Sequence, residues 1–273
     1  MLNWLRQLDA ILRGDATRIS ALKSGRIETP VAGVLVLSVL LAGLYGACIG
    51  SYAIIRTAWS DSGVTHDAFM QLLASTLKFP LLFGLTLLIT FPSLYVFNAI
   101  VGSRLTVLSV ARLLISMIAV MMAVLASLGP ILVFFSASTT SYPFMKVLNV
   151  VMAAIAGFLG LAFLLRTLGR LVVAQRPSPL PIDLPQPESP SDQQSPPAPD
   201  QSSPLDSLHI ATDEKAALVF RIWVVVFSIV GAQMSWVLRP FIGSPDMPFT
   251  WFRERQGNFF LDVAQAAGNL LGL

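Results

Sequence analysis

The stretch VAGVLVLSVLLAGLYGACIGSYAII, residues 31–55, decides the fold of this chain. It holds no charged residue and is followed at once by Arg56. About 20 apolar residues cross the hydrocarbon of a bilayer as an α-helix. A helix that is apolar on every face suits lipid rather than a water-exposed surface. The stretch therefore predicts a membrane-spanning helix and an all-α fold.

The composition of the whole chain agrees with that prediction. Of 273 residues, 55% are hydrophobic and 12% are charged, whereas soluble domains carry about 25% charged residues. A soluble core of this size would not bury so much apolar surface, so the composition excludes an ordinary soluble domain. The single cysteine, Cys48, lies inside the first apolar run, and we expect it to be a small packing residue.

Four further apolar runs predict a polytopic transmembrane helical bundle of about five spans. They are residues 79–101, 106–128 (extended as far as Phe135), 147–165 and 217–238. Phe79-Pro80 is expected to begin the second span and Phe91-Pro92 to kink it. Gly129-Pro130 is expected to end or kink the third span.

The segments outside these spans differ in composition. Residues 1–28 predict a cytoplasmic amphipathic segment, which lies in the membrane interface or caps the cytoplasmic ends of the bundle. Spans one to four occupy 29–175, a disordered Pro/Ser-rich linker 176–211, and span five 212–239. At Arg239-Pro240 the fifth span leaves the hydrocarbon. Residues 240–273 predict an exoplasmic interfacial segment that ends in an amphipathic helix. That helix lies on the outer surface, or against the bundle or a second subunit.

The positions of Lys and Arg predict the orientation. Twelve lie on the side of the N-terminus and six on the opposite side. The six are Arg56, Lys78, Lys146, Arg239, Arg253 and Arg255. The bias predicts a multi-pass protein of the bacterial cytoplasmic (inner) membrane, with its N-terminus in the cytoplasm and its C-terminus outside.

Few polar residues interrupt the predicted spans. The candidate intramembrane polar residues are Asn98, Arg112, Asn149 and Gln233. A charge within a span is a candidate functional residue, but Arg112 is close enough to the cytoplasmic end to reach the headgroups. Amides within spans commonly join helices to one another. If the four faced a shared cavity, they would indicate a transporter.

Small residues on the first span predict close helix packing. Gly43, Ala47 and Gly50 share a face, and Gly46 and Gly50 form a small-xxx-small pair. Such residues let helix backbones approach closely. We expect contact within the chain rather than a dimer.

No catalytic, cofactor-binding or metal-binding motif is present: the chain lacks HExxH, GxxxxGK[ST] and GxSxG. His66 and His209 fall in loops on opposite sides of the predicted topology. We therefore expect no cofactor and no enzymatic activity.

Three stretches carry a resemblance: FPSLYVFNAIVGSRL (91–105), YPFMKVLN (142–149) and LRPFIGSP (238–245). They are similar to an uncharacterised family of bacterial polytopic inner-membrane proteins. The five-span layout of residues 29–239 resembles the Yip1 family, although the Asp-Leu-Tyr-Gly-Pro signature of that family is absent. Neither resemblance implies a catalytic residue.

These observations predict a non-enzymatic membrane organiser or the membrane subunit of a complex, and a small-solute transporter or channel is the alternative. The expected partners are the lipid bilayer and a protein bound through the N-terminal helix or the Pro-rich linker. No nucleic-acid partner is expected.

Overall fold

The computed structural model describes residues 9, 31–59, 65–100, 107–174, 204–244, 247–254 and 257–272. Within these ranges the chain is all-α, with no strand. The helices are α3 (Val31–Ala58), α4 (His66–Ile100), α5 (Val107–Ser138), α6 (Tyr142–Ala174), α7 (Pro204–Val237) and α8 (Phe259–Leu271). The predicted linker up to residue 203, and the N-terminal segment apart from Asp9, lie outside the described residues.

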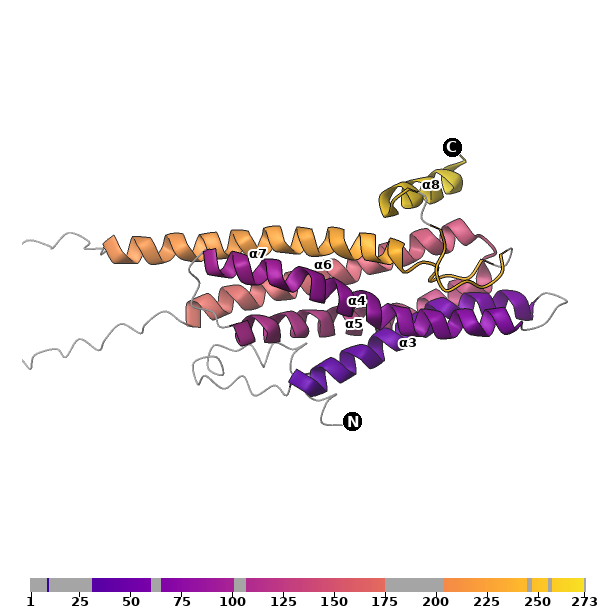
Figure 1. The fold of residues 1–273 in the computed structure, drawn as a ribbon, viewed down its shortest axis with the longest axis horizontal. Coiled ribbons are helices and arrows are strands. Elements are labelled where there is room, and N and C mark those ends of the chain that lie inside the picture. Colours follow the sequence, from indigo (N-terminus) through magenta and orange to yellow (C-terminus); the bar gives the residue numbers. More distant parts are fainter. Residues whose placement is uncertain are drawn as a thin grey trace, which may run out of the picture.

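The five long helices lie side by side and alternate in direction along the molecule (Figure 1). α3 packs on α4 and α5, α5 packs on α6, and α7 packs on α4 and α6. α3, α5 and α7 finish at the end of the bundle where α4 and α6 begin. We call this the capped end, because the chain after α7 folds over it and α8 lies beside it (Figure 1).

Four helices are long and apolar enough to cross a membrane: Ala32–Ala58, His66–Ser93, Val110–Ser138 and Tyr142–Thr167. They correspond to predicted spans one to four. The predicted fifth span is α7, whose described apolar part is Arg221–Val237. At about 1.5 Å per residue this part is about 25 Å long, slightly less than the roughly 30 Å of bilayer hydrocarbon. The fifth span therefore stays a prediction.

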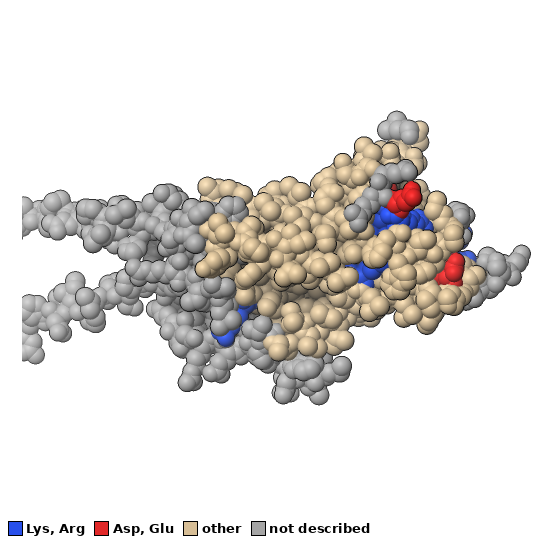
Figure 2. Space-filling model, viewed as in Figure 1, with Lys and Arg blue, Asp and Glu red and all other residues tan. Residues whose placement is uncertain are grey.

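The outward faces of these helices carry large apolar side chains. Figure 2 shows that the middle of the described surface is almost free of Lys, Arg, Asp and Glu, which gather toward the ends. An apolar belt of this kind is the surface that lipid requires. Its exposed members include Leu35, Val39, Leu44, Leu81, Leu88, Ile155, Phe158, Ile222 and Val225.

The core is centred on α5. This helix contributes Leu114, Met122, Leu125 and Leu132, each less than 2% exposed. Met side chains fill irregular gaps between helices because they are unbranched and flexible. Trp223 of α7 is also fully buried, and its indole donates a hydrogen bond to the carbonyl of Thr90 on α4 (3.0 Å). This bond joins α7 to the other helices.

One expectation about prolines is wrong. Pro80 does not begin a helix, because α4 starts at His66 and Pro80 lies inside it. Of the two alternatives for Pro130, an end of the helix is excluded, because α5 continues to Ser138. A proline inside a membrane helix is tolerated where neighbouring helices surround the interrupted backbone. The part of α4 before Pro80 is helical although it carries polar side chains, because these side chains have buried hydrogen-bond partners.

The helix that carries the predicted fifth span extends into the predicted linker. α7 begins at Pro204, whereas the span is predicted to begin at residue 212. Proline suits the first turn of a helix. The composition of residues 176–211 concealed this local signal.

Candidate functional site

The candidate site is the capped end, where the chain after α7 folds back onto α4. We call residues 238–244 and 247–254 the cap; they contain no helix. Their backbone polar groups need partners, since lipid supplies none.

Three polar side chains on one face of α4 supply partners to the cap. They are Gln71, Ser75 and Lys78, exposed by 3%, 0% and 2%, and their spacing of four and three residues places them on one helix face. Gln71 Nε2 donates hydrogen bonds to the carbonyls of Pro240 (3.3 Å) and Phe241 (3.2 Å). Ser75 Oγ donates to the carbonyl of Phe241 (2.5 Å).

Lys78 is the only one of the three that carries a charge. Its ammonium donates to the carbonyls of Pro240 (3.3 Å) and Trp251. It also lies 5.1 Å from the ring centre of Phe252 and 5.9 Å from that of Trp251, distances at which an aromatic face attracts a cation. Among the described residues no carboxylate pairs with it. The buried charge is therefore stabilised by carbonyl dipoles and aromatic rings.

Arg239 closes the cap from the side of α7. Its guanidinium lies 3.5 Å from the ring centre of Trp236 and donates a hydrogen bond to the carbonyl of Glu254. In return, the N–H of Arg253 donates to the carbonyl of Arg239 (3.4 Å). Burial lowers the pKa of Arg239 from its ordinary value, but arginine remains charged. The beginning and the end of the cap are thus joined.

α8 is attached to the bundle beside the cap. Lys146 of α6 lies 2.8 Å from both carboxylate oxygens of Asp262. Asn258 caps the helix, its side chain accepting a bond from the N–H of Leu261 (2.9 Å). Ala266 is buried, whereas the apolar residues Phe260, Leu261, Leu270 and Leu271 are exposed. The structure confirms a terminal helix, which contacts α6 and α7 through one side.

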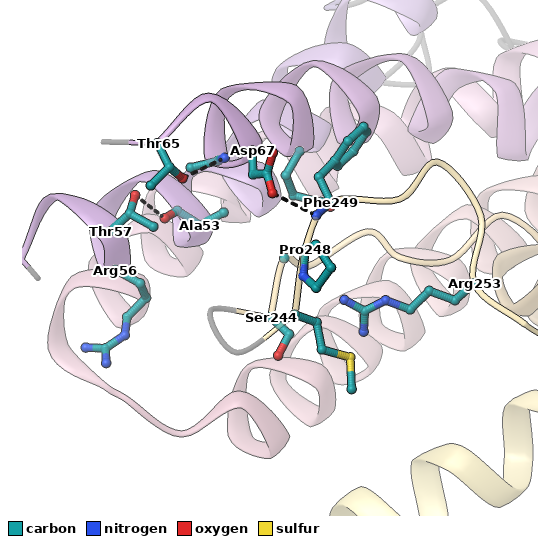
Figure 3. Close-up of a pocket in the computed structure, with 13 residues that line it drawn as sticks. Ala53, Arg56, Thr57, Thr65, Asp67, Ser244, Pro248, Phe249 and Arg253 are labelled. Atoms are coloured by element: carbon teal, nitrogen blue, oxygen red, sulfur yellow. Dashed lines mark hydrogen bonds between the residues drawn. The ribbon is translucent and has the colours of Figure 1, made fainter. Parts of the chain in front are cut away.

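A cavity of about 500 Å³ lies between the end of α3, the start of α4 and the cap (Figure 3). Asp67 closes one side and accepts a hydrogen bond from the N–H of Phe249 (3.1 Å). Arg56 and Arg253 stand on opposite sides, and Arg253 extends toward Ser244 (Figure 3). The remaining lining includes Ala53, Thr57, Thr65, Ala68, Gln71, Gly243, Met247 and Pro248. The cavity thus combines charged, hydroxyl and apolar groups.

The sequence-predicted polar residues do not gather at this site. Asn149 of α6 accepts a hydrogen bond from the hydroxyl of the fully buried Tyr45 (3.0 Å). Arg112 lies in the second turn of α5, half-buried. Gln233 is half-buried on α7. The side chain of Asn98 lies outside the part of the chain that the structure describes.

Arg112 and Asn149 belong to opposite ends of the bundle. Phe135 of α5 packs on Phe144 of α6, so Asn149 lies near the level of residue 130 of α5. That level is 18 residues from Arg112, or about 27 Å at 1.5 Å per residue. The two side chains therefore do not face a common cavity.

The small residues of α3 lie against α4. A Cβ atom on Gly46 would stand 2.5 Å from the Ser75 carbonyl oxygen, and one on Gly50 2.7 Å from the Leu72 Cα. Gly43 faces Thr76 more loosely, and Ala47 is half-buried. The contact lies within the chain, and the two backbones touch at Gly46 and Gly50.

The sequence interpretation missed Gln71, Ser75 and Lys78 as a group. The predicted second span begins at residue 79, so these three residues fall before it. Their i, i+4, i+7 spacing was the available signal, since it marks a polar stripe on a helix. The cap carbonyls that they bind lie more than 160 residues away in sequence, and no local pattern indicates such partners.

Comparison of the chain with protein-family models, with curated proteins and with solved structures finds no match. Within the described ranges, no group of three or more His, Cys, Asp or Glu residues could hold a metal ion.

Proposed function

We propose that this integral membrane protein is a non-enzymatic organiser of the membrane or the membrane subunit of a complex. The observation that carries the proposal is the construction of the cap. Buried side chains of α4 fix its backbone, while its outer side exposes Met247, Trp251 and Phe252 by 48–58%. A non-helical segment held in one conformation, with exposed large apolar groups, suits a partner surface.

The positions of the intramembrane polar residues support this function over a transporter. A substrate pathway needs polar groups that converge near the bilayer midplane. Arg112 and Asn149 lie about 27 Å apart along the bundle axis, and Asn149 already accepts a hydrogen bond from Tyr45.

The proposed location is the bacterial cytoplasmic membrane, with the N-terminus in the cytoplasm and the cap outside. The supporting observation is the excess of Lys and Arg in the segments opposite the capped end. The test is a cysteine placed at Ser244 in a Cys48→Ala background. A membrane-impermeant maleimide is expected to label it in intact cells, and labelling only after lysis would reverse the orientation.

The functional test is capture of the tagged full-length chain from native membranes in lipid nanodiscs, with quantitative mass spectrometry. A stoichiometric protein partner is expected with the unaltered chain and is lost with the double variant Met247→Ser/Phe252→Ser. The matched control is Phe158→Ser, an exposed apolar residue on α6 in the middle of the bundle, which should keep the partner. Absence of any partner, together with saturable stabilisation of the purified protein by a solute, would establish the transporter instead.

A further inference from the structure

The terminal helix α8 has three sides of different character, since 3.6 residues complete one turn. The first side is buried or half-buried and lies against the bundle, mainly against α6; it carries Phe259, Val263, Ala266 and Ala267. The second side is polar and carries Asp262, Gln265 and Asn269. The third side is apolar and exposed. We call it the α8 strip, and it carries Phe260 (53% exposed), Leu261 (52%) and Leu271 (75%).

The contact with α6 sets the depth of α8 in the bilayer. Asp262, in the first turn of α8, lies 2.8 Å from the ammonium of Lys146. The candidate span Tyr142–Thr167 has 26 residues, which is about 39 Å of helix and matches the roughly 40–45 Å of a bilayer including its headgroup regions. About 6 Å of α6 separates Lys146 from Tyr142. The first turn of α8 therefore lies near the boundary between the headgroups and the hydrocarbon.

The surface of the bundle next to α8 belongs to the apolar belt. Along α6, the next large exposed side chains after Lys146 are Val151 and Ile155, both 47% exposed. α8 lies outside the bundle, beside this helix (Figure 1). The lipid that covers the belt on α6 thus reaches α8 as well.

The charge and the size of the α8 strip favour lipid over a protein partner. Asp262 is the only charged residue of α8, and Lys146 pairs with it, so the helix adds no unpaired charge to the bilayer, where such a charge is costly. A stable protein interface buries about 800 Å² on each partner. Three large side chains, each of at most about 150–250 Å², do not supply that area.

We infer that α8 is an interfacial helix. Its first side packs on α6, and the α8 strip enters the lipid at the boundary between headgroups and acyl chains. The partner is the bilayer surface itself, and anionic lipid is not required, because α8 carries no Lys or Arg. The inference rests on the membrane spans and not on a protein partner, so it is tested separately from the organiser function.

The experiment places one spin label on the full chain, in a Cys48→Ala background, in phosphatidylcholine nanodiscs. Phe260→Cys and Leu271→Cys carry the label on the α8 strip, and Gln265→Cys carries it on the polar side of the same helix. Phe158→Cys is the reference for lipid, because Phe158 is 70% exposed on α6 in the middle of the bundle. Power saturation then compares collisions of the label with oxygen, which concentrates in lipid, and with a nickel chelate, which stays in water.

The ratio of oxygen to nickel collisions is expected to be several-fold higher at positions 260 and 271 than at position 265, and to shift in the same direction as at position 158. Equal ratios at 260, 271 and 265 would place the α8 strip in water and overturn the inference. Few collisions with either reagent at 260 and 271 would show that protein, such as a second copy of the chain, covers the strip, and would overturn it too.

A second measurement needs no label. In the same nanodiscs, Phe260→Ser/Leu261→Ser is expected to accelerate amide exchange of residues 259–271 about tenfold or more, because this apolar area no longer enters lipid. Gln265→Ser on the polar side is the matched control and should change exchange less than about twofold. Both variants keep the Lys146–Asp262 pair. Unchanged exchange in the double variant would show that the α8 strip does not hold the helix in lipid.

Discussion

The contact of α4 with α3 and its contact with the cap use the same turns of α4, residues 71–78, in opposite ways. On one side α4 meets α3, where Gly46 faces Ser75 and Gly50 faces Leu72. On the other side it meets the cap through Gln71, Ser75 and Lys78. The first contact depends on the absence of side chains, and the second depends on side chains that reach backbone carbonyls. Lipid is as apolar as the core, so α3 and α4 are held together mainly by close packing. The cap is not helical, so its backbone groups need partners and it is held by hydrogen bonds.

The largest expected effect is at the contact between α3 and α4. Gly46→Leu would place its Cβ 2.5 Å from the Ser75 carbonyl oxygen, and the helices would have to separate. We expect the free energy of unfolding to fall by about 3 kcal/mol or more. The readout is reaction of Cys48, the single cysteine, with a fluorogenic maleimide during unfolding in mixed micelles. Its sulfur packs against Gly129 of α5 and becomes reactive when the helices part.

Gly84→Leu is the matched control, because nothing lies within 4 Å of a Cβ atom at Gly84. If both variants lost the same stability, close packing at Gly46 would not be what holds α3 to α4.

The next effect is at the capped end. Lys78→Met keeps the length of the side chain but leaves the carbonyls of Pro240 and Trp251 without the ammonium. We expect the cap to lose about 2–3 kcal/mol of local stability. Hydrogen–deuterium exchange of residues 238–254 should accelerate, while exchange in the middle of α5 should not. Lys146→Met, which removes a cation beside α8 instead, is the control and should leave the cap slow. A cap that exchanges slowly in Lys78→Met would show that Lys78 does not hold it.

The same contrast explains what the sequence could predict. The apolar runs predict the all-α fold and four of the spans, because the bilayer imposes length and apolarity on each helix separately. Gly46 and Gly50 were recognisable for the same reason, since small residues four apart mark a close contact whichever helix is opposite.

The ends of the elements were not predictable in this way. The predicted second span begins at residue 79, and the polar residues before it suit water as well as they suit a buried partner. The partner is a segment more than 160 residues away, and only the tertiary structure brings it there. The capped end could therefore not be derived from local pattern.

A smaller effect tests a polar contact between α3 and α6. Tyr45→Phe removes the hydroxyl that donates to Asn149 Oδ1 across α3 and α6. Such bonds between membrane helices are worth about 1 kcal/mol, so we expect a loss of that size in the Cys48 assay. Tyr95→Phe is the control, because Tyr95 is 52% exposed and should change nothing measurable. A loss above 3 kcal/mol would mean that polar contacts, and not glycine packing, dominate the attachment of α3 as well.

The smallest effect is at the rim of the capped end. The Lys146–Asp262 pair is 30% and 26% exposed at its two side chains, and solvent screens such pairs to about 0.5–1 kcal/mol. Lys146→Met and Asp262→Asn should each release α8 slightly, seen as faster amide exchange in residues 259–271. A double-mutant cycle should give the coupling of the pair.

Because 1 M salt shortens the screening length to about 3 Å, the coupling free energy between Lys146 and Asp262 should shrink in high salt. Amide exchange in the cap should not change in high salt, because the hydrogen bonds from Lys78 to the cap are buried. If salt loosened both alike, the distinction between a buried cap and a surface-attached α8 would be wrong.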